Sequence, residues 1–285
     1  MSAPAVGRET GTGTVDVGNG VELRYERRGD HGPDVVLIPN FFMDAAGWWP
    51  FTPRLLDGCR LLAYDLRGQG ASTHPPQQPT WDDHVRDLGV LLDRLDLGPA
   101  VLVGSSFSAL IARDYALARP ERVRGLVFAG PALSPWGTGR HRLIIRSWIR
   151  TLERQGLSAL YSQMYPLVAG DWKAEATGNA GFLARRQGFL AHHTADEVGA
   201  GLAASMAADP DPDLLTRLRS PTLLVVGDDD FSLAGSGVEE LLRLLPDGRG
   251  VVVPRAGHLP FVDDPQTFQS AVAAFVAATG PGEQT

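Results

Sequence analysis

The stretch VLVGSSFSALIARDYA, at residues 101–116, decides the fold. An apolar run at 101–103 precedes Gly104, and a helix-like run follows, so Ser106 lies at a strand-to-helix boundary. A tight turn at this boundary would project the Ser106 hydroxyl above the edge of a sheet, and the small residues Gly104 and Ser108 would make room for it. The alternative is that these serines simply cap the following helix, so the interpretation needs support from the rest of the chain.

Short apolar runs and longer helix-like stretches alternate on both sides of this serine. Runs typical of buried strands lie at 35–39, 61–65, 100–103, 123–128, 222–226 and 250–253. Stretches with helical character lie at 48–56, 81–95, 107–118, 238–245 and 265–278. A hairpin is predicted where strands 14–17 and 21–27 flank Gly18-Asn19-Gly20. The alternation predicts an α/β fold with a mostly parallel central sheet and helices on both faces.

The alternation stops in the middle of the chain, from about residue 131 to residue 210. This region shows only helical segments rich in Trp, Arg, Leu and Ala. We therefore expect an α/β core formed by residues 1–132 and 208–285, with a helical lid inserted at residues 133–207. The lid carries aromatic side chains that suit either a substrate pocket or packing against the core: Trp136, Trp148, Tyr161, Tyr165, Trp172, Phe182 and Phe189.

A serine nucleophile needs a base, because an unassisted hydroxyl hardly ionises at neutral pH. His258 follows the predicted strand 250–253, in a loop opened by Gly257. The carboxyl ends of parallel strands meet at one edge of a sheet, so this loop is expected to lie near Ser106. The remaining histidines are expected to be surface or structural residues: His31, His74, His84, His141, His192 and His193.

The acid that orients the imidazole is expected in GDDDFS, directly after the predicted strand 222–226. Asp228, Asp229 and Asp230 all qualify by their chemistry. Like charges this close repel one another, so at least one of the three should face water. The order along the chain is then serine, acid and histidine, each directly after a strand.

In this order and spacing, the chain resembles the α/β-hydrolase superfamily over roughly residues 13–278. Three further segments resemble motifs of that family: YDLRGQGAS at 64–72, ARPERVRGLVFAGPA at 118–132 and AGHLPFVDDP at 256–265. The resemblance implies a catalytic triad of Ser106, Asp230 and His258, with Asp229 as the second choice for the acid. It also implies the family's lid over the site.

Two positions depart from the family pattern. The family's serine turn ends in glycine, whereas this chain has Ser108, whose hydroxymethyl group would either loosen the turn or bond locally. The family's oxyanion loop carries His-Gly, whereas this chain has Pro39-Asn40. The resemblance implies that the backbone N–H groups of Phe41 and Phe107 form the oxyanion hole. Asn40 would add a side-chain donor or hold the turn.

A basic stripe is predicted at the start of the lid, from arginines about four residues apart: Arg140, Arg142, Arg146, Arg150 and Arg154. A solvated helix face is the simpler interpretation. The sharper interpretation is a docking surface for an acidic partner, such as an acyl-carrier protein that delivers a thioester, or a site for an anionic substrate. The stripe is unusual because the chain as a whole has a net charge of −7.

Composition excludes several other classes of protein. The 285 residues are 44% hydrophobic and 21% charged, as in an ordinary globular protein. A net charge of −7 argues against a nucleic-acid-binding role. Cys59 is the only cysteine, which leaves no internal disulfide and no thiolate zinc site, and we expect neither a metal nor a cofactor. The chain shows no apolar run of about 18 residues and no signal-peptide pattern, so we expect a cytoplasmic protein without a membrane span.

Together these features predict a serine hydrolase that cleaves an ester, lactone or thioester of a small to medium acyl substrate through an acyl-enzyme. The alternative is an acyltransferase or cyclase, in which an amine or hydroxyl takes the acyl group, including one delivered as a carrier-protein thioester. A non-catalytic ligand receptor on the same fold is a third hypothesis. Fold and triad alone leave the substrate open.

Overall fold

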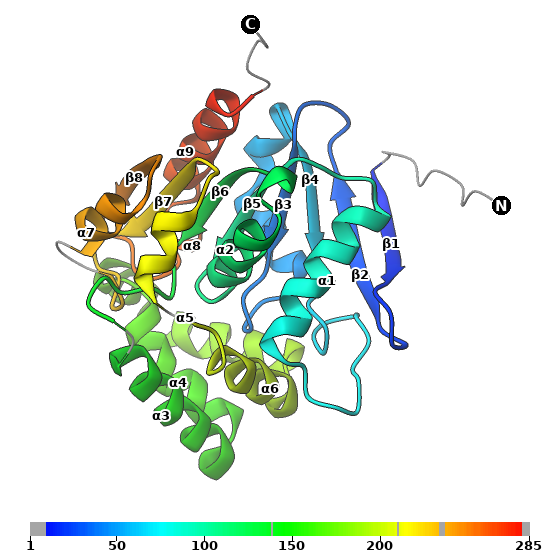
Figure 1. Ribbon diagram of the computed structural model, residues 1–285. Helices are drawn as coiled ribbons and strands as arrows, with labels where there is room; N and C mark the ends of the chain where they lie inside the picture. Colours follow the sequence, from blue (N-terminus) through cyan, green and yellow to red (C-terminus); the bar gives the residue numbers. More distant parts are fainter. Residues whose placement is uncertain (1–9, 138, 210, 234–236, 281–285) are drawn as a thin grey trace, which may run out of the picture.

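The computed structural model describes residues 10–137, 139–209, 211–233 and 237–280, and the strands within them form one eight-stranded sheet (Figure 1). The strands are β1 Gly11–Asp16, β2 Glu22–Arg28, β3 Asp34–Ile38, β4 Arg60–Tyr64, β5 Ala100–Ser105, β6 Val123–Ala129, β7 Thr222–Gly227 and β8 Gly248–Val253. Their order across the sheet is β1-β2-β4-β3-β5-β6-β7-β8. Strand β2 pairs antiparallel with β1 and β4, and the other neighbouring strands pair parallel. The predicted α/β class is confirmed.

Both faces of the sheet are covered, which is why its central strands are continuous apolar runs. Successive strand residues point to opposite faces, so in β3 Val36 and Ile38 belong to one apolar cluster and Val35 and Leu37 to the other. The first face packs against α1 Trp81–Arg94, α2 Ser108–Ala118 and α7 Gly237–Leu244. The second face packs against η1 Ala45–Phe51, η2 Pro53–Asp57, α8 Pro260–Asp263 and α9 Pro265–Ala278.

The single helix predicted over residues 48–56 is wrong. The chain forms two short 3₁₀-helices there, η1 and η2, which meet at Thr52. Pro50 lies inside η1 and Pro53 begins η2. A proline has no N–H to donate to the carbonyl four residues earlier, so an α-helical ladder cannot continue through both positions.

Between β6 and β7 the described residues form four α-helices: α3 Gly139–Gln155, α4 Leu157–Val168, α5 Asp171–His192 and α6 Ala195–Ser205. Figure 1 shows them gathered at one end of the sheet, below its strands. Helix α5 is kinked at Gly178, where φ is 60°. The short helices η3 Pro120–Arg122 and η4 Pro212–Arg217 precede β6 and β7.

The division into a core at 1–132 and 208–285 and a lid at 133–207 stays a prediction. Residues 1–9, 210, 234–236 and 281–285 of that core, and residue 138 of that lid, lie outside the described residues. In the described part of the chain, no helix is long and apolar enough to cross a membrane.

Candidate active site

Ser106 lies in a strained turn between β5 and α2. Its φ is 55°, in the left-handed region that costs an L-residue roughly 1–2 kcal/mol. Tertiary hydrogen bonds hold this conformation, because the Ser106 N–H donates to the Ala129 carbonyl at 3.1 Å and its own carbonyl accepts from the Ala132 N–H at 3.1 Å. This backbone conformation turns the Ser106 hydroxyl away from the hydrogen-bonded strands and toward the space above the edge of the sheet.

The small residues around Ser106 have different roles. A Cβ on Gly104 would lie 2.5 Å from the Ser108 carbonyl oxygen, so helix α2 can approach the strand only over a glycine. Ser108 is buried, and its Oγ accepts from the Ser105 N–H at 2.8 Å and lies 2.8 Å from the Ile38 carbonyl, to which it can donate. Of the two predicted outcomes for this departure, local bonding is the one observed: the hydroxyl joins the turn to β3.

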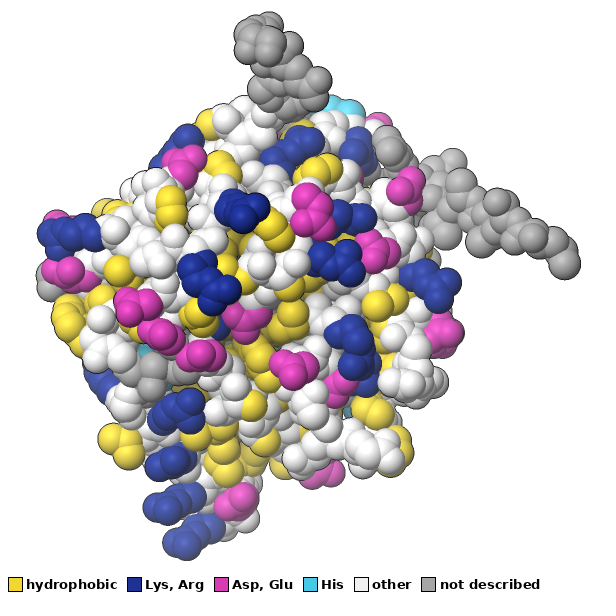
Figure 2. Space-filling view, in the orientation of Figure 1, with side chains coloured by type: hydrophobic (Ala, Val, Ile, Leu, Met, Phe, Trp, Pro, Cys, Tyr) yellow, Lys and Arg dark blue, Asp and Glu magenta, His cyan; other side chains and the backbone are white. Residues whose placement is uncertain are grey.

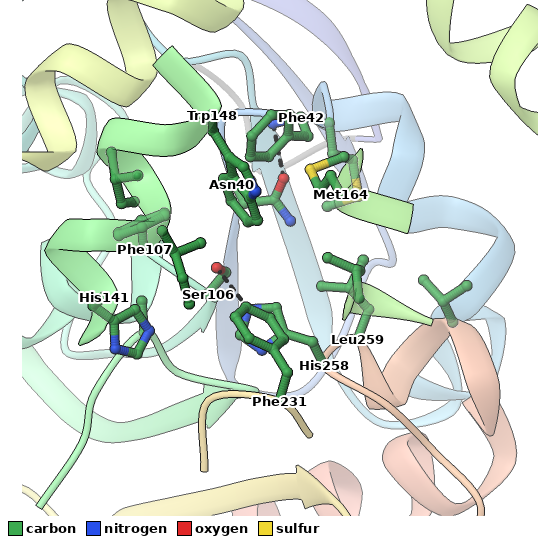
Figure 3. Close-up of a pocket in the computed structure, with 16 residues that line it drawn as sticks. Asn40, Phe42, Ser106, Phe107, His141, Trp148, Met164, Phe231, His258 and Leu259 are labelled. Carbon is green, nitrogen blue, oxygen red and sulfur yellow. Dashed lines mark hydrogen bonds between the residues drawn. The ribbon is translucent and has the colours of Figure 1, made fainter. Parts of the chain in front are cut away.

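Two side chains from the loops after β7 and β8 complete a hydrogen-bonded chain with Ser106, and Figure 3 shows its contact with His258. His258 Nε2 lies 2.9 Å from Ser106 Oγ. His258 Nδ1 lies 3.0 and 3.1 Å from the two carboxylate oxygens of Asp230, which is fully buried. The structure thus brings together the three residues predicted as the triad.

The charge state of Asp230 defines which ring nitrogen of His258 carries the proton. Burial acts to raise the pKa of Asp230, but the positive charge of His258 in its protonated form and the hydrogen bonds from His258 and Ser232 outweigh it and hold the pKa below its usual value. The ionised carboxylate only accepts hydrogen bonds, so Nδ1 of the neutral imidazole carries the proton. Nε2 then presents its lone pair to the Ser106 hydroxyl. Ser232, which the sequence analysis missed, donates from its N–H and its hydroxyl to Asp230 Oδ1 at 2.8 and 2.7 Å.

The neighbouring aspartates do not contact the imidazole. Asp229 is exposed, and its Oδ2 accepts from the Asp171 N–H at 2.6 Å, at the start of α5. Asp228 Oδ1 accepts from the Ala256 N–H at 3.3 Å. The structure therefore separates the three candidates by their partners: Asp230 contacts His258, whereas Asp229, the second choice for the acid, contacts the start of α5.

The two backbone N–H groups predicted as an oxyanion hole are both free of acceptors among the described residues. Phe107 lies at the N-terminus of α2, where the helix dipole favours a negative charge. The N–H of Phe42 is already occupied, since it donates to Asn40 Oδ1 at 2.9 Å. That leaves the N–H of Phe41 as the donor from this loop.

Asn40 holds the turn, and one of the two N–H donors of its side-chain amide has an acceptor among the described residues. Besides accepting from Phe42, its side chain donates to Ser105 Oγ at 3.3 Å, and its carbonyl accepts from the Met43 N–H at 3.2 Å. The YDLRGQGAS segment supports the same loop, because Asp65 Oδ1 accepts from the Ala45 N–H at 2.8 Å.

A cavity of about 210 Å³ opens beside Ser106 and His258. Apart from these two residues, Asn40 and His141, its walls are apolar. The apolar lining consists of Phe42, Met43, Phe107, Ala132, Ile144, Ile145, Trp148, Met164, Val168, Phe231, Leu259 and Val262. Helices α3 and α4 supply part of this wall, so the helical insertion forms one side of the cavity. Its size suits a small to medium apolar group.

His141 was expected to be a surface or structural residue, but it lies in the wall of this cavity (Figure 3). Burial, followed by the nearby charge of His258, lowers its pKa to about 4, so the ring is neutral at neutral pH. A neutral imidazole offers one donor and one acceptor to a bound molecule. The sequence held a signal: His141 shares the buried face of α3 with Ile145, Trp148 and Leu152, a polar residue in an apolar stripe.

The aromatic residues of the insertion divide into lining and surface groups. Trp148 lines the cavity, and Tyr161, Tyr165 and Phe189 line a neighbouring one. Phe182 packs against Tyr165, with ring centroids 5.2 Å apart. Trp136 and Trp172 are wrong as pocket candidates, because both side chains are exposed on the surface.

The predicted basic stripe lies on α3. Arg140, Arg146, Arg150 and Arg154 are exposed, and Figure 2 shows a column of Lys and Arg side chains where Figure 1 draws this helix. Arg142 departs from the prediction, because it is half-buried and its Nη1 donates to the Met206 carbonyl at 3.3 Å. Its guanidinium is engaged at the end of α6 instead of facing solvent.

Among the residues that the structure describes, no group of three or more His, Cys, Asp or Glu side chains could hold a metal ion. The one cysteine, Cys59, is buried, and burial raises the pKa of its thiol. The polar side chains that line the cavity are Asn40, Ser106, His141 and His258.

Comparisons with known proteins agree with this fold. A family model described as alpha/beta hydrolase fold matches residues 33–265. A protein of Bacillus subtilis (strain 168), named as a 2-succinyl-6-hydroxy-2,4-cyclohexadiene-1-carboxylate synthase, is 27% identical over 94% of this chain and 99% of its own length. A pimeloyl-acyl-carrier-protein methyl ester esterase of Aeromonas hydrophila subsp. hydrophila is 29% identical over 90% of this chain and 100% of its own length. The structure of a thermophilic esterase from Thermogutta terrifontis matches with a TM-score of 0.81, at 26% identity, over 94% of this chain and 99% of that one.

Proposed function

The chain belongs to the α/β-hydrolase fold family and is an enzyme of the hydrolase class, and from this premise we propose that it cleaves an ester, lactone or thioester through an acyl-enzyme. The observation that carries the proposal is the 2.9 Å contact between Ser106 Oγ and His258 Nε2, made by a serine held at a φ of 55°. The relative from Aeromonas hydrophila and the Thermogutta protein are both named as esterases, which supports an ester as the substrate class.

In the proposed reaction, Ser106 Oγ attacks the acyl carbonyl carbon while His258 Nε2 takes its proton. Asp230, bound to Nδ1 at 3.0 Å, stabilises the imidazolium that forms. The tetrahedral oxyanion accepts hydrogen bonds from the N–H groups of Phe41 and Phe107, each worth roughly 3–4 kcal/mol in the transition state. His258 then protonates the leaving group, and the acyl group stays on Ser106.

Water completes the cycle by the same route in reverse. His258 takes a proton from a water molecule, which attacks the acyl carbonyl, and the proton passes to Ser106 as the acid leaves. The neutral ring of His141 in the cavity wall supports binding of a substrate that carries one polar group beside its apolar part.

The first test uses Ser106→Ala. Wild-type protein is expected to be labelled at Ser106 by a fluorophosphonate and to turn over some members of a panel of p-nitrophenyl esters and acyl thioesters. The variant is expected to lose labelling and at least about 10³-fold of kcat. Turnover that survives in Ser106→Ala would reject the nucleophile, and labelling without multiple turnover would favour a ligand receptor.

A second candidate is an acyltransferase or cyclase that uses the same acyl-enzyme. Its support is the mostly apolar cavity wall, together with a relative named as a synthase. Product analysis with and without an added amine or alcohol distinguishes the two functions. Free acid as the only product in both cases would reject the second candidate.

The basic stripe of Arg140, Arg146 and Arg150 is proposed as the docking surface for an acidic carrier protein that brings the substrate as a thioester. The name of the Aeromonas hydrophila relative includes an acyl-carrier protein in its substrate, which supports a partner of this kind. Exposed arginines on one helix would steer an acidic partner by charge complementarity.

The docking proposal predicts that removing arginines of the stripe lowers kcat/KM more for a carrier-bound substrate than for a free ester. For Arg146→Gln combined with Arg150→Gln, the ratio of kcat/KM for a carrier-bound acyl group to that for a p-nitrophenyl ester should fall about tenfold, and less at high salt. Arg94→Gln, which removes an exposed arginine at the end of α1, is the matched control and should keep the wild-type ratio. An equal ratio in all three proteins would reject the docking surface.

A further inference from the structure

A second cavity, of about 160 Å³, adjoins the one beside Ser106. Five residues line both cavities: Phe42, Met164, Val168, Leu259 and Val262. Figure 3 shows Phe42, Met164 and Leu259 on the side of Ser106 opposite His141, so the second cavity extends the site in that direction. We call it the distal chamber. A chain bound at Ser106 would reach it along an apolar wall.

The distal chamber is also lined by two cationic side chains from α5, Lys173 and Arg185. Within the described residues, neither forms an ion pair with a carboxylate. Lys173 is half-buried, and its Nζ reaches only the Val262 carbonyl, at 3.5 Å. Half-buried Lys173 and exposed Arg185 thus place two positive charges along an apolar chamber, where an anion would be stabilised.

One carboxylate, Asp263, also lines the distal chamber, and the charges of Lys173 and Arg185 act on it without forming an ion pair. Asp263 Oδ2 accepts from the Gly257 N–H at 2.8 Å and so holds the loop that carries His258. Two cations and one anion leave the chamber with one net positive charge. The charge balance therefore still favours an added anion.

An unpaired hydroxyl lines the same chamber. The Tyr165 hydroxyl oxygen is buried and has no hydrogen-bond partner in the described part of the chain. A buried polar group without a partner costs about 1–3 kcal/mol, which a bound acceptor would recover. A phenol that lines the same chamber as two cations can donate to a carboxylate oxygen, so this orphaned donor and the cations point to the same kind of ligand.

We propose that the distal chamber binds a carboxylate at the far end of the substrate's acyl chain, so that the preferred substrates are half-esters of dicarboxylic acids. The proposal rests on the proposed function, because it assigns the scissile ester to Ser106 and the free carboxylate to Lys173, Arg185 and Tyr165. The apolar residues shared by the two cavities would contact the methylene chain between the two ends. Selection would then come from chain length and from the terminal charge together.

The test measures binding rather than turnover, so that it can fail independently of the proposed function. Ser106→Ala protein is titrated, by calorimetry, with monomethyl esters of straight-chain dicarboxylic acids and with methyl esters of monocarboxylic acids of matched length. At one or two chain lengths the half-ester should bind about tenfold or more tightly than its uncharged match, which corresponds to roughly 1.4 kcal/mol. Added salt should reduce that preference.

Adding Lys173→Gln and Arg185→Gln should abolish the preference for the half-ester. The matched control is Arg186→Gln: Arg186 lies next to Arg185, but its guanidinium packs over the Phe182 ring at 5.6 Å and it lines neither cavity. This control should keep the preference. Equal binding of charged and uncharged esters at every length, or the same loss in the Arg186 control, would overturn the proposal. Absence of ester hydrolysis in the wild type would instead count against the proposed function.

Discussion

Asp230 shows how far the proposed role of the triad acid can be assigned to one residue from the sequence. GDDDFS contains three aspartates of equal chemistry, and only the resemblance to a family selected the third. The structure separates them by burial and by partner: Asp230 is fully buried beside His258, whereas Asp229 is exposed and accepts from the Asp171 N–H. Burial and partner are set by segments far away in the chain, so a local pattern could not have decided between them.

The role of Asp230 predicts a large effect from Asp230→Asn. The amide can donate to Nδ1, which would move the imidazole proton to Nε2 and leave His258 unable to accept the Ser106 proton. We expect kcat to fall roughly 10⁴-fold with little change in KM, measured on the best ester of the panel. The matched control is Asp229→Asn, whose amide oxygen still accepts from Asp171 and which should stay within about tenfold of the wild type. Equal losses in the two variants would show that the acid is assigned wrongly.

At the scale of elements, the turn between β5 and α2 is joined to β3 by one side chain. Ser108 Oγ accepts from the Ser105 N–H and lies within hydrogen-bond distance of the Ile38 carbonyl. Strand periodicity predicted both strands, but not this bond, since nothing local marks which carbonyl lies opposite a given hydroxyl. A similar limit explains the error at residues 48–56, where helical spacing was outweighed by the two prolines.

Ser108→Ala should destabilise the protein. The substitution leaves the buried Ser105 N–H without its acceptor, so we expect the free energy of unfolding to fall by about 1–3 kcal/mol. Urea denaturation followed by circular dichroism measures the change. Ser270→Ala, which removes an exposed hydroxyl bonded to the Gln266 carbonyl in α9, is the control and should change stability by less than about 0.5 kcal/mol. Similar losses in the two variants would mean that the Ser108 bond adds nothing specific.

At the scale of the whole molecule, two buried histidines make stability depend on pH. Burial lowers the pKa of His84 to about 4, and both ring nitrogens lack partners in the described residues. His141 has a similar pKa, about 4, for the same main reason. The unfolded chain takes up these protons below about pH 6.5, whereas the folded protein takes them up only near pH 4. The free energy of unfolding therefore falls as the pH drops through this window.

His84→Leu should remove part of this acid sensitivity. A shift of this size corresponds to roughly 3 kcal/mol per histidine, so the loss of stability between about pH 7.5 and about pH 4.5 should be smaller in the variant. Buried carboxylates such as Asp65 titrate in both proteins and cancel in the comparison. The measurement is urea denaturation at the two pH values. An unchanged pH dependence would show that His84 is protonated as readily in the folded protein as in the unfolded chain.

The sequence by itself determined the α/β alternation, the turn at Ser106 and the order of serine, acid and histidine, because periodicity and turn chemistry are properties of neighbouring residues. Only the tertiary structure decided which groups meet. It joined Ser106, Asp230 and His258 from three separate loops and brought His141 into the cavity wall. It also placed Lys173 and Arg185 in the lining of the distal chamber. These contacts depend on how distant helices and strands pack. The shape and burial of a side chain in the packed protein decide its partners, and no single stretch of sequence encodes that arrangement.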